Sequence, residues 1–259
     1  MSFVMSPENL QLLANFKPQF YDGENMSVFW ETTPEVVAKL LPPPLKPAEM
    51  PLVWAYVASF QKTNFNCSYN EAALLLACEF DGELGFHVIS MPVTDDMAMV
   101  GGRERFGYPK KIAQVSLTSG DGTVEGWVER HGIRIFQLNA TLGGKPNAAD
   151  AAAVMGQYVQ PPIKIFLFKC FGAPGEGFDY NPRLVRQEIN SETKQMDVAE
   201  AEVTLTPSND DPWAEVEVMR VIGGLHLISD STMEPGTVVA EVDPAEYAPY
   251  AFSKIDPMF

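Results

Sequence analysis

The feature that most constrains the fold is a regular succession of short apolar segments separated by tight turns. The segments are rich in β-branched and aromatic residues, and the turns carry Asp-Gly and His-Gly pairs. Turns of this kind join neighbouring antiparallel strands. We therefore expect strands at residues 52–60, 72–80, 85–93, 112–117, 124–130, 133–141, 163–171, 184–189, 198–205, 216–221 and 225–229.

Strands at such spacing predict an α+β protein that is mainly β. We expect an antiparallel sheet curled into a closed or half-closed barrel or cone, with short helices outside it. Capping residues followed by proline predict helices that begin near Pro7 and Pro34, and Asp150 begins a third. Long helices do not alternate with the strands, so a doubly wound parallel sheet is not expected. The prolines at 42–51 lie between apolar residues and read as a turn, so residues 1–259 are expected to form a single domain.

Charge and cysteine content narrow the partners. The chain has 259 residues and a formal net charge of −16. Such a chain repels nucleic acid and anionic membranes, so neither is an expected partner. No apolar run approaches the roughly 20 residues that span a bilayer, and the N-terminal residues do not resemble a secretion signal. The three cysteines form no Cys-x-x-Cys pair, which predicts a reduced, cytoplasmic protein.

Most catalytic motifs are missing from the sequence. There is no glycine-rich nucleotide loop and no serine-hydrolase elbow, and the three histidines lack metal-ligand spacing. We expect no metal and no cofactor. What remains is residues 101–112, which hold four of the 18 lysines and arginines. The simplest interpretation of this segment is a charged surface loop, with Gly101-Gly102 as a turn.

Three details of the same segment favour a reactive lysine instead. Pro109 fixes the backbone directly before Lys110. Phe106 and Tyr108 can supply apolar walls. A strand then begins near Ile112, so Lys110 and the next residue point to opposite faces, and one of the two amines can enter a cavity.

A lysine in a cavity has a distinct chemistry. Imine formation needs the neutral amine, yet a free lysine with a pKa of about 10.4 is neutral in only about one molecule in two thousand at pH 7. Burial and nearby cations can lower the pKa of a lysine by up to about 3–5 pH units. Because Lys110 and Lys111 alternate between faces, we expect desolvation to outweigh their mutual repulsion. The segment therefore predicts an enzyme that forms a Schiff base on Lys110.

The same residues resemble a known family. Gly102-Arg103-Glu104 and residues 108–111 resemble the signature of the acetoacetate decarboxylase superfamily, which is itself a standard example of an imine-forming lysine. Residues 41–45, 51–53 and 69–71 extend the resemblance. The resemblance implies that Lys110 forms the Schiff base, that Lys111 tunes it, and that Glu71 is the active-site glutamate that orients substrate or moves a proton.

Two departures from the family pattern concern the substrate. The position that matches the family's carboxylate-binding arginine is Gly23, and Tyr56 replaces a second glutamate. The lysine chemistry is kept while the decarboxylase's substrate clamp is lost. The sequence therefore resembles the branch that forms pyruvate imines. We predict a lyase of the aldolase–dehydratase kind, acting on a small 2-oxo acid and an aldehyde. Candidate substrate contacts are Arg103, Tyr56, Tyr69, Tyr108 and Tyr250.

Two alternatives stay open. A true acetoacetate decarboxylase could use Arg103 or Arg105 in place of the missing arginine. A non-catalytic barrel that binds a small acid or a pigment would have an inert Lys110. The family resemblance also implies a homo-oligomer, and the apolar strands, which carry few protecting lysines, favour covered sheet edges.

Overall fold

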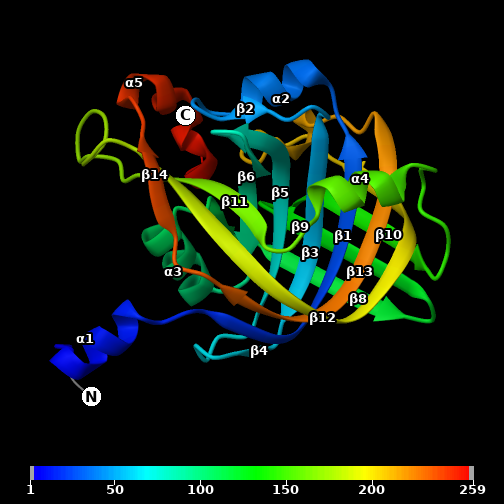
Figure 1. Cartoon of the computed structure of the whole chain (residues 1–259), viewed down its shortest axis with the longest axis horizontal. Helices are drawn as coiled ribbons and strands as arrows, with labels where there is room; N and C mark the ends of the chain where they lie inside the picture. The colour runs from blue at the N-terminus through cyan, green and yellow to red at the C-terminus, as the bar shows by residue number, and fades with distance from the viewer. Residues whose placement is uncertain (1–2, 257–259) are drawn as a thin grey trace.

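The computed structural model describes residues 3–256 and is dominated by β-strands (Figure 1). All fourteen strands of the described residues belong to one sheet. They are β1 (Gln19–Glu31), β2 (Lys46–Pro47), β3 (Leu52–Phe60), β4 (Lys62–Thr63), β5 (Tyr69–Phe80), β6 (Glu83–Val93), β7 (Lys110–Ile112), β8 (Gln114–Gly120), β9 (Thr123–Arg130), β10 (Ile133–Leu142), β11 (Ile163–Lys169), β12 (Arg183–Leu205), β13 (Arg220–Met233) and β14 (Thr237–Glu241). The predicted mainly antiparallel sheet with short helices is confirmed.

Seven strands curl the sheet partly into a ring. Neighbours in this ring run in the order β11, β6, β5, β3, β1, β13 and β12, and β11 then pairs again with β12. The closing contact between β6 and β11 is parallel and short: only Ile165 pairs with Phe86, and Phe166 with His87. The other ring pairings are antiparallel. The predicted curled sheet is therefore present, although its ring is only partial.

The strands β10, β9 and β8 continue from β12 and fold over the outer face of the ring. Gly126 of β9 lies so close to β3 that an added Cβ would stand 2.9 Å from the Val57 side chain. Both faces of the central strands are thus buried, and their sequences read as continuous apolar runs. In β5, Leu74 packs into the outer core and Leu75 into the core inside the ring.

The helices are short and lie around the sheet (Figure 1). They are α1 (Pro7–Ala14), α2 (Pro34–Leu40), α3 (Asp96–Phe106), α4 (Ala151–Tyr158), α5 (Pro244–Tyr247) and the 3-10 helices η1 (Trp213–Glu215) and η2 (Ala248–Lys254). The α1 helix has no buried residue and projects from the body. Among the described residues, no helix has the length and apolar character needed to cross a membrane.

Three local features differ from the expectation. A separate strand at 216–221 does not form, because η1 and a loop extend to residue 219 and residues 220 and 221 begin β13. Gly101-Gly102 is not a turn but lies within α3, which Asp95 caps by accepting a hydrogen bond from the Ala98 N–H. The strand β1 had not been expected, since its polar first half hides the apolar second half.

Candidate functional site

The short segment from α3 to β7 positions both lysines. Gly107 ends α3 in a left-handed conformation, with φ of 96°, and its N–H donates to the carbonyls of Gly102 and Arg103. An added Cβ at Gly107 would stand 2.7 Å from the Phe168 carbonyl oxygen, so both conformation and space require glycine here. The chain then enters β7, where Lys110 pairs in parallel with Met91 of β6.

Lys110 is buried, with 6% of its surface exposed. Its Nζ lies 2.6 Å from Glu71 Oε2 on β5. The rings of Tyr69 and Tyr108 flank the amine, with centroids 5.3 Å and 5.7 Å from Nζ. The stem of the lysine passes so close to Gly102 of α3 that any side chain there would require the lysine to move. The amine is therefore held in one place by an acid, two rings and a glycine.

Glu71 is held from a second side. Tyr56 of β3 donates its hydroxyl hydrogen to Glu71 Oε1 at 2.7 Å, while Oε2 accepts from Lys110. Burial raises the pKa of Tyr56 well above its ordinary value, and the Glu71 charge adds to this. Burial and the same carboxylate also raise the pKa of Tyr69. Both phenols therefore stay protonated and act as hydrogen-bond donors.

Tyr108 belongs to a further buried chain of hydrogen bonds. Its hydroxyl donates to Gln187 Oε1 at 2.6 Å, and Gln187 Nε2 donates to the Glu234 carbonyl at 3.0 Å. Burial raises the pKa of Tyr108, with a smaller contribution from Glu71. Gln187 is fully buried on β12 and had not been picked out from the sequence. A lone glutamine among strand residues gives no signal of its partner 79 positions away.

A cavity of about 160 Å³ occupies the inside of the ring next to this pair, and we call it the lysine cavity. Tyr56, Tyr69, Glu71 and Tyr108 line it, so the structure brings four of the expected site residues together around the Lys110 amine. Most of the remaining wall is hydrocarbon. It is formed by Phe20, Phe29, Trp54, Phe60, Leu75, Val88, Met91, Val159, Ile163, Ile165, Ile189, Leu225, Leu227 and Met233.

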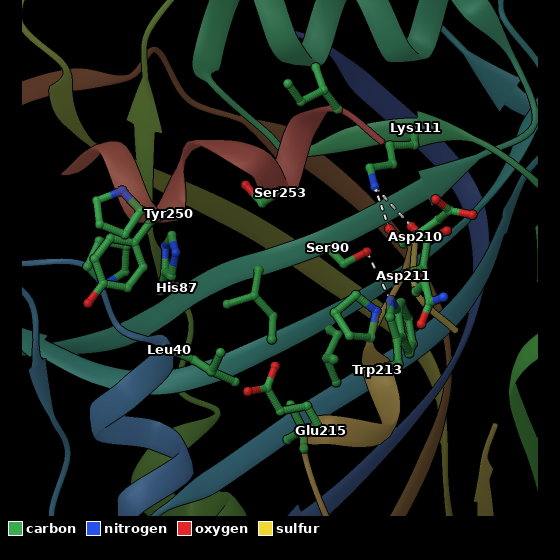
Figure 2. Close-up of a pocket in the computed structure, with 18 of the residues that line it drawn as sticks. Leu40, His87, Ser90, Lys111, Asp210, Asp211, Trp213, Glu215, Tyr250 and Ser253 are labelled. Carbon is green, nitrogen blue, oxygen red and sulfur yellow. Dashed lines mark hydrogen bonds and ion pairs between the residues drawn. The ribbon is translucent and has the colours of Figure 1, made fainter. Parts of the chain in front are cut away.

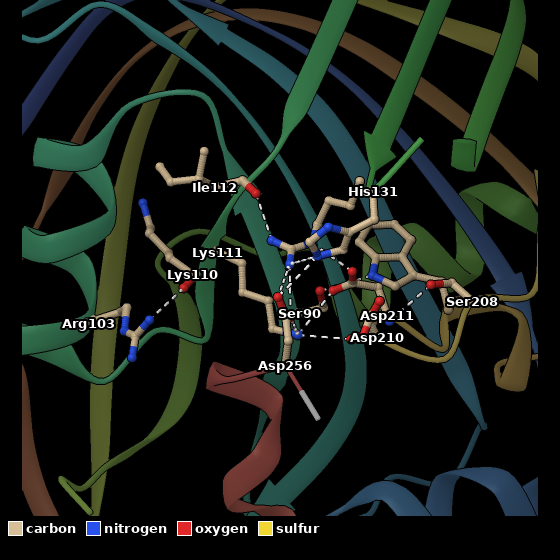
Figure 3. Close-up of polar contacts among 12 residues, drawn as sticks. Ser90, Arg103, Lys110, Lys111, Ile112, His131, Ser208, Asp210, Asp211 and Asp256 are labelled. Atoms are coloured by element: carbon tan, nitrogen blue, oxygen red, sulfur yellow. Dashed lines mark hydrogen bonds and ion pairs between the residues drawn. The ribbon is translucent and has the colours of Figure 1, made fainter. Parts of the chain in front are cut away.

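The side chain of Lys111 leaves β7 in the opposite direction (Figure 3). It is also buried, at 9% exposure, but its Nζ contacts the carboxylates of Asp211 at 3.2 Å and Asp256 at 2.9 Å. Arg130 binds the same two carboxylates. Burial alone would raise the pKa of Asp256, but its hydrogen bond with Lys111 and the other charged neighbours lower that pKa to about 2. The Lys111 charge is thus compensated locally, outside the lysine cavity.

A second cavity, of about 280 Å³, lies on the outer face of β5 and β6 (Figure 2). Lys111 and Tyr250 line this second cavity, so Tyr250 is not near Lys110 and is corrected as a substrate contact of that lysine. Although this cavity is larger, its lysine already contacts two carboxylates. The two lysines therefore lie in different surroundings, because Lys110 contacts the single carboxylate of Glu71.

Arg103 is also outside the lysine cavity. Its Nη1 donates to the Lys110 carbonyl at 3.5 Å, and its side chain lines a third cavity on the far side of α3 with Cys170 and Lys254. The expectation that Arg103 binds the substrate of Lys110 is corrected accordingly. Lys254 was not expected from the sequence. It is buried, its Nζ donates to the Phe168 carbonyl at 2.7 Å, and burial lowers its pKa.

Among residues 3–256, no group of three or more histidine, cysteine or acidic side chains is arranged to hold a metal ion. The chemistry that this site offers is that of an amine beside a carboxylate. The amine can form an imine, and the carboxylate can move a proton to or from the atoms next to it.

Comparison with known proteins identifies the family. The sequence model of the family described as acetoacetate decarboxylase matches residues 3–242. Acetoacetate decarboxylase of Chromobacterium violaceum is 27% identical over 226 residues, which cover 85% of this chain and 87% of that protein.

Two solved structures show the same fold. Acetoacetate decarboxylase from Legionella pneumophila superposes with a TM-score of 0.78 at 23% identity, covering 87% of this chain and 88% of that chain. The enduracididine biosynthesis enzyme MppR, in complex with the condensation product of pyruvate and imidazole 4-carboxaldehyde, gives a TM-score of 0.75 at 20% identity. That match covers 93% of this chain and 97% of the other. With a family model that spans most of its length, the chain belongs to the acetoacetate decarboxylase family.

Proposed function

We propose that this enzyme is a Schiff-base lyase in which Lys110 binds the carbonyl carbon of a small 2-oxo acid and the product arises by aldol condensation and dehydration. The observation that carries the proposal is the buried contact of 2.6 Å between Lys110 Nζ and Glu71 Oε2, whose carboxylate lines the lysine cavity. An amine nucleophile and a proton carrier thus stand side by side, away from bulk water.

The steps follow from these two groups. When the Lys110 amine is neutral, the proton of the pair resides on Glu71. The amine attacks the keto carbon, and Glu71 gives its proton to the departing hydroxyl, so that water leaves and an iminium and the Glu71 carboxylate remain. The iminium withdraws electrons, so Glu71 can remove a proton from the adjacent methyl group. The resulting enamine carbon attacks the aldehyde carbon, and the protonated Glu71 returns its proton to the new alkoxide. Loss of this oxygen as water and hydrolysis of the iminium release an unsaturated 2-oxo acid and the free lysine.

The composition of the cavity wall favours condensation over decarboxylation. Loss of carbon dioxide requires the carboxylate to be held with its bond to carbon aligned with the iminium, and an arginine fork does this well. Of the described residues that line the lysine cavity, none is an arginine, and Gly23 lies in its wall. Arg103 faces another cavity, and Arg105 donates to the carbonyls of Leu13 and Phe16. The complex of MppR with a pyruvate condensation product supports the same choice.

Borohydride reduction in the presence of pyruvate, followed by peptide mapping, tests the proposal. We expect the label on Lys110, lost in Lys110→Arg, which keeps the charge but not the nucleophile. Lys254→Met is the matched control, because Lys254 is a second buried amine with a lowered pKa. Label on Lys254, or the absence of any label, would contradict the proposal and would favour a binding protein without imine chemistry.

A second assay separates the two reactions. We expect deuterium from solvent to exchange into the methyl group of pyruvate, measured by NMR, and little carbon dioxide from acetoacetate. Loss of one charge-assisted contact, about 2–4 kcal/mol, would slow decarboxylation by roughly 30- to 1,000-fold. Rapid carbon dioxide release without pyruvate exchange would identify an ordinary acetoacetate decarboxylase instead.

A further inference from the structure

The deep part of the lysine cavity lies well beyond the reacting groups. Glu71 and Leu75 both line the cavity from β5, four residues apart, which is about 13 Å along a strand. At the level of Leu75 the ring brings in Trp54 of β3, and beside Trp54 stands Phe29 of β1. A small 2-oxo acid bound at Lys110 would leave this deep part unfilled.

The deep part offers no charge and little free polarity. Glu71 is the only charged residue among the described residues that line the cavity. The polar groups between Glu71 and the level of Leu75 already have partners: Trp54 Nε1 donates to Ser27 Oγ at 2.9 Å, and Ser27 Oγ donates at 2.7 Å to Asn25 Oδ1, which lies at the level of Glu71. A polar ligand group placed there would lose its water without gaining new partners.

Free hydroxyls lie instead on the opposite side of Glu71. Ser229 pairs with Gly23 on β1, and Ser231 pairs with Phe20. Asn25 of β1 lies at the level of Glu71, because both residues pair with Ala58. Gly23 and Phe20 precede Asn25, so both serines lie beyond Glu71 on the side away from Leu75, which we call the mouth of the lysine cavity. Both serines line the cavity and are partly exposed. A carboxylate can be held and solvated at this mouth, whereas the deep end suits hydrocarbon alone.

From these observations we propose, resting on the function above, that the aldehyde partner carries an uncharged hydrocarbon group of up to about six carbon atoms that fills the deep part of the lysine cavity. The volume sets the upper limit. A dry engineered cavity of about 150 Å³ holds one benzene molecule, and the whole lysine cavity, including its mouth, measures about 160 Å³. A phenyl or pentyl group fits this space, while the methyl group of acetaldehyde leaves most of it empty.

The reaction balances without further reactants. The methyl carbon of the pyruvate imine loses one proton and bonds to the aldehyde carbon. The aldehyde oxygen leaves as water with that proton and a second one from the same carbon, so no electron donor or acceptor is needed. Each product is a 2-oxo acid with a double bond conjugated to its keto group. Its absorbance reports the rate directly.

The test compares aldehydes at fixed pyruvate concentration. Each buried methylene should raise kcat/KM about fourfold, so hexanal, with four more methylenes, should exceed acetaldehyde by about 250-fold, and benzaldehyde should exceed it by a similar factor. Glyoxylate, which has a charged group instead, should fall below acetaldehyde. If borohydride with pyruvate labels Lys110 and the four aldehydes react alike, the inference is overturned while the proposed function stands. If Lys110 is not labelled, the proposed function fails.

Two neighbouring leucines provide matched variants. Leu75 lines the lysine cavity and Leu74 lines the second cavity, and each is 1% exposed. Leu75→Phe should reduce the preference for hexanal over acetaldehyde at least tenfold, whereas Leu74→Phe should leave that preference unchanged. Because the readout is a ratio, partial loss of folded protein does not affect it. Leu227→Phe, at a partly exposed position of the same wall, serves if Leu75→Phe does not fold.

A binding measurement keeps the inference testable without catalysis. Hexanol and benzyl alcohol resemble the aldehydes but cannot condense. Calorimetry should show that both bind the wild-type protein and bind Leu75→Phe at least tenfold more weakly. Equal binding to Leu75→Phe and Leu74→Phe, or no binding to the wild type, would overturn the inference whatever the fate of the lysine label.

Discussion

Gly102 sets the position of Lys110, the lysine proposed to form the imine, and an added methyl group there should reduce activity far more than stability. An ideal Cβ at Gly102 would stand 2.7 Å from Lys110 Cε, 2.8 Å from Cδ and 3.4 Å from Nζ. Carbon atoms pack at about 3.5–4.0 Å, so the lysine stem must move by about 1 Å. The contact of 2.6 Å between Nζ and Glu71 Oε2 cannot survive such a shift unchanged.

A displacement of the Lys110 amine by about 1 Å should have a large effect on the reaction rate. Misplacing a reacting group by 1 Å can cost about 100-fold in rate. We therefore expect Gly102→Ala to slow both borohydride labelling with pyruvate and deuterium exchange by about 100-fold. Stability should change little, because the obstructed atoms belong to a flexible side chain, and alanine replaces glycine inside a helix with a gain of about 0.5–1 kcal/mol.

Gly101→Ala is the matched control. It precedes Gly102 in α3, is exposed, and has no atom within 4 Å of an added Cβ. It should keep full activity and melt at the same or a slightly higher temperature. Activity of Gly102→Ala within threefold of wild type, together with a normal melting temperature, would refute the claim that this glycine positions Lys110. Equal loss in both variants would point to the helix as a whole.

Three further outcomes are expected. Glu71→Gln should lower the rate of pyruvate exchange by about 10²- to 10⁴-fold, because the amide cannot accept the proton. Tyr56→Phe, which removes only one hydrogen bond to Glu71, should lower the rate about tenfold. Similar losses in both variants would contradict the role of Glu71 as the proton acceptor. Burial lowers the pKa of His87 to about 4, so the folded state resists protonation that the unfolded chain accepts near pH 6.5. Stability should therefore be complete above about pH 6.5 and fall by about 3 kcal/mol as the pH drops to about 4, and urea titrations of His87→Gln should lack this slope. The chain should form a homo-oligomer, since α1 exposes apolar side chains such as Leu12, at 71%; a monomer in light scattering would contradict this.

Most strands could be predicted from the sequence because turn residues lie at their ends. Turns such as Asp81-Gly82 and His131-Gly132 adopt the positive φ angles that their sequences predict. The strand β1 was not predicted from the sequence, because it has a register shift at Asp22 and Gly23 and because the polar residues Asn25 and Ser27 face the ring interior. The α3 helix was not predicted from the sequence, because its two adjacent glycines are poor helix formers. Only the close approach of the Lys110 side chain explains why Gly102 is a glycine.

The site was only partly predictable for a related reason. The opposite directions of Lys110 and Lys111 follow from the local alternation of a strand. The partners of Lys111 do not, because Asp211 and Asp256 lie 100 or more residues away in the chain. Arg103 is close to Lys110 in sequence, yet its position on α3 directs it into another cavity. Tyr250 was chosen as a candidate substrate contact, yet it lines the cavity on the outer face of the sheet.

The short parallel contact between β6 and β11 has a consequence for access to the lysine cavity. It is the weakest seam of the ring, since only two residue pairs join the strands there. Gly85 brings the strands together, as an added Cβ would stand 2.7 Å from the Lys164 carbonyl oxygen. Ile163 and Ile165 of β11 line the lysine cavity beside this seam. Transient opening of the contact between β6 and β11 would expose apolar side chains and not Lys110. An apolar molecule would then enter the cavity between these strands while an imine at Lys110 stays shielded from water.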